Sequence, residues 1–158
     1  MRDEAQHKAR VDGWVERTAA GAAPAVRVKL FDEALSALWT RTLTTLGEVT
    51  LTAIADRVLS NASEKFPVFA ALTVQPTAGI QARALLEHLD ATDEAELEGG
   101  IRFVLVEFLS VLGTLTAEIL TPELHDELSR VGHAEATLLA RGVTDSAKAR
   151  SQGKNHDD

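Results

Sequence analysis

The feature that most restricts the fold is an apolar stretch in the second half of the chain. Between Phe103 and Leu115 the residues are mainly aliphatic or aromatic, and Glu107 is the one charged residue. A helix that is apolar around its whole circumference must be enclosed by other elements, and this stretch is too short to span a bilayer. We therefore expect a central, buried helix. Its inward stripe is predicted to comprise Ile101, Leu105, Phe108, Leu112, Leu115 and Ile119.

Further helices are predicted where apolar residues recur at intervals of three and four. They fall at residues 26–47, 51–59 and 78–90, and a last one starts at Thr121, where Pro122 suits the first helical turn. The Thr and Val residues around 51–59 lower helix propensity and leave a strand as the alternative there. With a helix over residues 2–18, the pattern predicts an all-α fold of about six helices in a single domain.

The two ends of the chain differ from its middle in composition. Residues 1–20 are predicted to form a charged N-terminal docking helix, residues 26–141 the helical domain, and residues 143–158 a disordered tail of small and polar residues. An amphipathic helix outside the core has to bury its apolar face against something. The predicted partner-binding residues on that face are Val11, Trp14 and Val15.

Composition excludes several classes of function. The chain has no cysteine, so it has neither a disulfide nor a thiolate metal site nor a cysteine nucleophile. Its formal net charge of -8 argues against nucleic acid as a partner, because such binding depends on clustered Lys and Arg. The charged N-terminus is not a secretory signal, and no stretch suits a membrane span, so we expect a cytoplasmic protein.

A search for catalytic and metal-binding motifs predicts neither kind of site. Glu4-x-x-His7 has the spacing of a helical carboxylate–histidine pair, but it stands alone on a polar helix. His125 is expected to be an exposed helix histidine. Glu107, within the apolar stretch, either faces outward, pairs with Arg102 or is buried with a raised pKa.

Two segments of the predicted helices resemble a known family. Residues 37–43 have the sequence ALWTRTL, and residues 56–63 have the sequence DRVLSNAS. Both are similar to the N-terminal domains of RsbR-type stressosome sensors, which begin with a comparable Leu-Trp-Thr-x-Thr-Leu helix. This resemblance implies a globin-like domain that binds no haem and acts in a bacterial stress response.

Two further segments are similar to bacterial globins. Residues 120–128 have the sequence LTPELHDEL, like the last helix of those globins, which often starts Thr-Pro-Glu. Residues 66–69, Phe-Pro-Val-Phe, are similar to the corner where globins place a proline and a haem-contacting phenylalanine. Together the resemblances cover most of residues 26–141 and imply a globin-like helical bundle.

The same resemblance identifies the residues that would bind haem. They are His88 as the candidate iron ligand and Phe69 as a ring contact, and they have this role only if haem is bound. Only residues 91–100 separate the helix at 78–90 from the central helix, which leaves little room for the helix that carries the proximal histidine of haem globins. The expected protein therefore has no cofactor, and haem is the alternative.

These observations predict a non-haem, globin-like sensory or regulatory protein that signals through protein–protein contacts as a homodimer. RsbR-type proteins carry a C-terminal signalling domain that this sequence lacks, so its output is expected to pass to a separate signalling partner. Two alternatives stay open: a haem-binding gas sensor, and a helical small-ligand-binding or structural bundle. An enzyme is not expected, because catalysis requires convergent polar groups and the sequence offers no such pair at convincing spacing.

Overall fold

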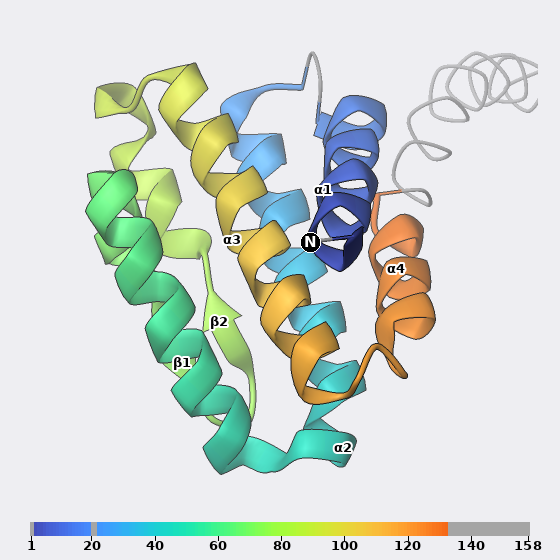
Figure 1. The fold of residues 1–158 in the computed structure, drawn as a ribbon. Helices are drawn as coiled ribbons and strands as arrows, with labels where there is room; N and C mark the ends of the chain where they lie inside the picture. Colours follow the sequence, from blue (N-terminus) through green and yellow to red (C-terminus); the bar gives the residue numbers. More distant parts are fainter. Residues whose placement is uncertain (1, 20–21, 133–158) are drawn as a thin grey trace, which may run out of the picture.

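The core is built around two helices, α2 (Pro24–Lys65) and α3 (Glu94–Leu115). The computed structural model describes residues 2–19 and 22–132, and Figure 1 shows α3 running across the first half of α2. The predicted central helix and the all-α class are confirmed. The fully buried side chains of α3 include Leu97, Ile101, Val104, Leu105, Phe108, Leu109 and Leu112.

Helix α2 is bent at one glycine. Gly47 has φ 82° and ψ 164°, a backbone conformation that only glycine adopts readily. The bend turns the second half of α2 back along the bundle (Figure 1). The predicted end of a helix at Gly47 is thus confirmed, and the alternative of a strand at residues 51–59 is wrong because this run is helical.

A small hairpin replaces part of a predicted helix. After the 3-10 helix η2 (Pro67–Ala71), strand β1 (Thr73–Gln75) pairs antiparallel with β2 (Gly79–Gln81), with Val74 opposite Ile80. The 3-10 helix η3 (Arg83–Ala91) follows. The prediction of one helix over 78–90 is therefore wrong. Gly79 has φ +90°, which a helix does not accept, and the strand buries Ile80 instead.

The N-terminal helix belongs to the core. Helix α1 (Arg2–Trp14) continues as a π-helical turn, η1 (Val15–Ala19), and packs against α3. Val11, Trp14 and Val15 are at most 1% exposed, and the Trp14 indole N–H donates to the Val131 carbonyl at 2.9 Å. These expected partner contacts are thus made inside the chain. That expectation assumed that the helix lies outside the core, whereas α1 packs against α3.

The central helix ends earlier than its apolar stripe predicted. Leu115 and Ile119 are 54% and 76% exposed, because the chain turns away after α3 to begin α4 (Thr121–Arg130). Thr121 is the first residue of α4 and Pro122 lies in its first turn, as expected. The connection between α3 and α4 passes next to α1 and carries part of the candidate site described below.

Two sequence-based expectations concern parts of the chain beyond Gly132. The predicted tail at 143–158, and the last residues of the domain predicted over 26–141, lie outside the described residues. Among the helices that the structure does describe, none is both long and apolar enough to cross a membrane.

Candidate functional site

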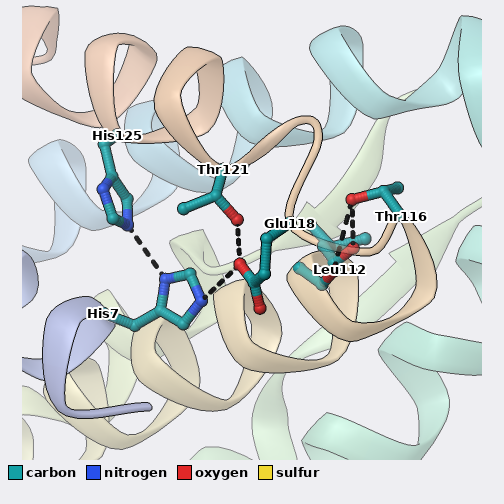
Figure 2. Close-up of polar contacts among 7 residues, drawn as sticks. His7, Leu112, Thr116, Glu118, Thr121 and His125 are labelled. Atoms are coloured by element: carbon teal, nitrogen blue, oxygen red, sulfur yellow. Dashed lines mark hydrogen bonds and ion pairs between the residues drawn. The ribbon is translucent and has the colours of Figure 1, made fainter. Parts of the chain in front are cut away.

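Two histidines from opposite ends of the described chain meet inside the protein. The Nδ1 atom of His7 and the Nε2 atom of His125 lie 2.9 Å apart, with the two rings nearly perpendicular at 82°. On the other side of the His7 ring, Nε2 lies 3.5 Å from the Glu118 carboxylate (Figure 2). We call His7, His125 and Glu118 the histidine cluster.

The cluster joins three elements and is largely sealed from solvent. His7 lies on α1, His125 on α4, and Glu118 in the connection between α3 and α4. The exposed fractions of His7 and His125 are 0% and 4%, and the Glu118 side chain is 27% exposed. Both imidazoles are therefore buried polar groups, which cost free energy unless their nitrogens find partners.

The backbone around Glu118 is bent in an unusual way. Ala117 and Glu118 have φ of 51° and 63°, the left-handed region, and the Glu118 N–H donates to the Gly113 carbonyl at 2.7 Å. The Thr121 hydroxyl donates to the Glu118 carboxylate (Figure 2). A Cβ on Gly113 would lie 2.6 Å from Glu118 Oε2, so this glycine leaves the space that the carboxylate occupies.

The left-handed turn predicts a stabilising substitution. Alanine in this region costs roughly 1 kcal/mol, which glycine does not incur, so Ala117→Gly is expected to raise the free energy of unfolding by up to about 1 kcal/mol. Ala117 is exposed, so no packing is lost. Urea denaturation measures the change. Ala53→Gly, at an exposed position inside α2, is the control and should destabilise by a similar amount. A loss of stability in Ala117→Gly would contradict the assigned backbone conformation.

The surroundings of the pair disfavour the protonated form of His125. Burial lowers the pKa of His125 below its ordinary value of 6.5, and the neighbouring His7 and Arg10 lower this pKa further. Glu118 and Asp126 raise it, with a smaller effect. The neutral form of His125 is therefore favoured when the protein is folded.

The hydrogen-bond geometry fits one arrangement of protons in the neutral pair. If the N–H of His7 is on Nε2, on the side of the ring that faces Glu118, Nδ1 is left as an acceptor for the N–H of His125. The hydrogen bond joins only the two rings, because Nε2 of the buried His7 has no hydrogen-bond partner among the described residues and lies 3.5 Å from Glu118, a distance that makes an ion pair only when His7 is charged. The pair can therefore share a proton between α1 and α4.

A metal ion is not supported by the described residues. They contain no group of three or more His, Asp or Glu side chains placed to hold one. The cluster offers two facing nitrogens, with its carboxylate on the far side of the His7 ring.

The candidate haem residues lie elsewhere and do not form a pocket together. His88 is exposed in the last turn of η3, where its carbonyl accepts a hydrogen bond from the Thr92 hydroxyl at 2.5 Å. Phe69 is fully buried and packs against the rings of Phe31 and Phe66. Neither residue lines either of the two open grooves described next.

Those two grooves are open to the surface. One lies along the first half of α2 and α4, and includes the ion pair between Arg41 and Glu123 at 2.7 Å. The other lies between α1, α3 and the end of α2, over Phe66 and Phe103. No residue of the histidine cluster lines either groove, so neither groove gives a small molecule a route to the imidazoles.

Of the three states that the sequence left open for Glu107, the structure shows neither a pair with Arg102 nor full burial, and Glu107 lines the groove over Phe66 and Phe103. Its carboxylate accepts a hydrogen bond from the Asn61 amide at 2.6 Å and is half-buried. Arg102 pairs with Asp12 on α1 at 2.5 Å and with Glu98 at 3.3 Å. Arg102 is thus paired with these two carboxylates, and the alternative of an Arg102–Glu107 pair is wrong.

Sequence reasoning missed the histidine cluster, although a signal for it was present. His125 was expected to be exposed, which is wrong. His7 precedes the buried Val11 by four residues, and His125 precedes the buried Leu128 by three, so both histidines lie on apolar helical faces. The meeting of His7 with His125 depends on tertiary packing of α1 against α4, which helical spacing cannot supply.

Comparison with known proteins gives no match from which a function could be inferred. No family model matches the chain, and neither a curated protein nor a solved structure is significantly similar to it. The resemblances to stressosome sensors and bacterial globins therefore rest on the short motifs in the sequence.

Proposed function

We propose that this chain is a haem-free sensory or regulatory protein of the cytoplasm that signals through protein contacts as a homodimer. The observation that carries the proposal is the buried imidazole pair that joins α1 to α4. Because its charge state affects how two elements pack, the pair can convert a chemical change into a change of shape. A globin-like bundle is part of the proposal, supported by the order of α3 and of α4 with its Thr-Pro-Glu start.

The burial of the cluster favours a regulatory role over catalysis. A catalytic base must come within hydrogen-bond reach of a substrate atom. His7 and His125 are enclosed by α1, α4 and the connection between α3 and α4, and each faces the other rather than solvent. A proton that either ring binds or releases is therefore expected to affect the packing of the protein and not a substrate.

The cluster lies next to a surface suited to a second copy of the chain. Glu118 is followed directly by Ile119, which is 76% exposed, and Leu115 lies three residues before Glu118 and is 54% exposed. Exposed large aliphatic side chains are typical of contact surfaces when they gather. We propose these two exposed aliphatic side chains, which lie on either side of Glu118 in the sequence, as the dimer contact.

The dimer contact is tested by charge substitution. Ile119→Asp is expected to convert a dimer into a monomer, because a carboxylate would be buried without a partner at the interface. The matched control is Leu86→Asp, at an exposed position on η3. Size-exclusion chromatography with light scattering gives the mass of each. A wild-type monomer at all concentrations, or equal effects of the two variants, would contradict the proposed interface.

The absence of haem from the proposal is tested by absorption spectroscopy. Because His88 is exposed and Phe69 is packed into the core, added hemin is expected to give no Soret band assignable to a histidine-ligated complex. The spectrum is recorded before and after hemin, with His88→Ala in parallel. A Soret band that His88→Ala removes would overturn the haem-free assignment and favour the gas-sensor alternative.

A further inference from the structure

We propose that the His7–His125 pair is a proton-operated latch, which holds α1 against α4 and releases it when both imidazoles become charged. The inference rests on the proposed function, since it takes the histidine cluster as the sensing element. It adds the signal, which is a proton, and the moving part, which is α1.

The latch depends on the number of protons bound to the two rings, because a hydrogen bond between them needs one facing nitrogen that carries no hydrogen. With both rings neutral, one of the two facing nitrogens carries a hydrogen and donates it to the other across 2.9 Å. With one added proton the two facing nitrogens still share a single hydrogen, so the hydrogen bond persists, and Glu118 lies close enough to balance the charge. A second proton places N–H groups on both facing nitrogens, and the hydrogen bond is lost.

The charged groups around the pair make the doubly charged state unfavourable while α1 stays docked. Arg10, on α1, adds a third positive charge near His125. Two carboxylates partly offset these positive charges: Glu118 in the connection between α3 and α4, and Asp126 on α4. Glu118 lies on the far side of the His7 ring from His125, so no carboxylate lies between the two imidazoles. Two positive rings in contact at low dielectric repel strongly.

The direction of the response follows from linkage. The pKa of His125 in the folded protein is lowered by burial and then by His7, whereas a solvated histidine keeps its ordinary value of 6.5. As the pH falls below 6.5, the form in which His125 is solvated takes up the proton first. Acidification therefore favours release of α1, and a return to neutral pH favours docking.

Release of α1 would break the Arg102–Asp12 ion pair and remove the apolar side chains of α1 from the core, but it would leave α2 packed against α3. The described part of η1 ends at Ala19 and α2 begins at Pro24, and α2 and α3 pack directly against each other. Release would expose the apolar face of Val11, Trp14 and Val15, which is buried in the docked state. It would also expose the surface of α3 on which that face packs. The face that the sequence predicted for partner contacts thus becomes available only in the released state.

The test uses Trp14 as its reporter in the full chain. The protein has two tryptophans, so Trp39→Phe leaves Trp14 alone. Emission of Trp14 and far-ultraviolet circular dichroism are followed from about pH 8 to about pH 5, where most carboxylates stay charged. We expect the emission to shift to the red below the ordinary histidine pKa, while most of the helical signal persists.

Variants assign that transition to the latch. His125→Gln keeps an amide that can donate to His7 but cannot be charged, so the red shift is expected to disappear. His7→Gln provides a second test if the first variant folds poorly. The matched control is His88→Gln, because His88 is exposed and far from the cluster in the chain, and its transition should equal that of the parent. Hydrogen exchange should locate the faster-exchanging amides in α1.

The outcomes separate the latch from the proposed function. No red shift, a red shift that coincides with loss of the helical signal, or an unchanged transition in both glutamine variants would overturn the latch. Because the reporter is intramolecular, these results do not depend on dimer formation. Conversely, a chain whose Trp14 responds as expected but which remains a monomer would support the latch and contradict the proposed dimer.

Discussion

Replacing Trp14 with alanine is expected to lower the free energy of unfolding by about 3–5 kcal/mol. The indole is 1% exposed and lies among the core residues, and its N–H donates to the Val131 carbonyl at 2.9 Å. Truncation removes the buried ring, leaves a cavity where α1 meets α3, and leaves the Val131 carbonyl without this donor.

The size of this effect distinguishes two views of α1. If α1 were a docking helix outside the core, Trp14→Ala would change binding to a partner and leave the stability of the monomer nearly unchanged. Urea denaturation followed by circular dichroism measures the difference, with Trp14→Phe as a milder variant if the alanine form does not fold. Val49→Ala, at a residue 87% exposed, is the control and should change stability by about 0.5 kcal/mol or less. A similarly small effect at Trp14 would contradict the packing of α1.

Helical periodicity predicted much of the bundle because burial in a helix leaves a regular trace in the sequence. The central helix was placed correctly, since a stretch as apolar as 103–115 has no stable position at a surface. The break at Gly47 was also placed correctly, because glycine both weakens a helix and permits the left-handed backbone that the bend needs. Both predictions use only residues that are close to one another along the chain, which a single sequence shows.

The hairpin could not be predicted in the same way. Residues 78–90 carry apolar positions at helical spacing, yet Gly79–Gln81 pair with Thr73–Gln75 as strands. The pairing is stabilised by tertiary contacts: Ile80 is buried, and the backbone N–H of Ala82 donates to the Asp32 carboxylate of α2 at 3.0 Å. Contacts with residues some 50 positions away outweigh local propensity, and one sequence does not reveal them.

The candidate site was hidden for a related reason. His7 and His125 each occupy an apolar helical face, so their burial could have been inferred, but a lone helix histidine is usually exposed or structural. Their pairing needs α1 and α4 to pack side by side, and it needs the left-handed turn that brings Glu118 to the ring of His7. Neither condition follows from spacing, because 118 residues separate the two histidines.

The second large effect is expected at Gly79, where two costs act together. Gly79 has φ +90°, and a Cβ there would lie 2.6 Å from Cγ of the fully buried Trp39. Gly79→Ala should therefore lower the free energy of unfolding by about 2–5 kcal/mol, of which strain contributes about 1–2 kcal/mol and overpacking about 1–3 kcal/mol. The indole of Trp39 cannot retreat freely, because its N–H donates to the Pro76 carbonyl at 3.3 Å.

Gly47→Ala separates these two costs. Gly47 has φ +82°, close to that of Gly79, but a Cβ there would meet no atom within 4 Å. Its substitution should destabilise by strain alone, about 1–3 kcal/mol, and urea denaturation of both variants shows whether Gly79→Ala carries an added cost from contact with Trp39. Adding Trp39→Phe to Gly79→Ala should recover part of that added cost, since a smaller ring leaves more room. Equal losses at Gly79 and Gly47 would mean that the hairpin does not press against Trp39.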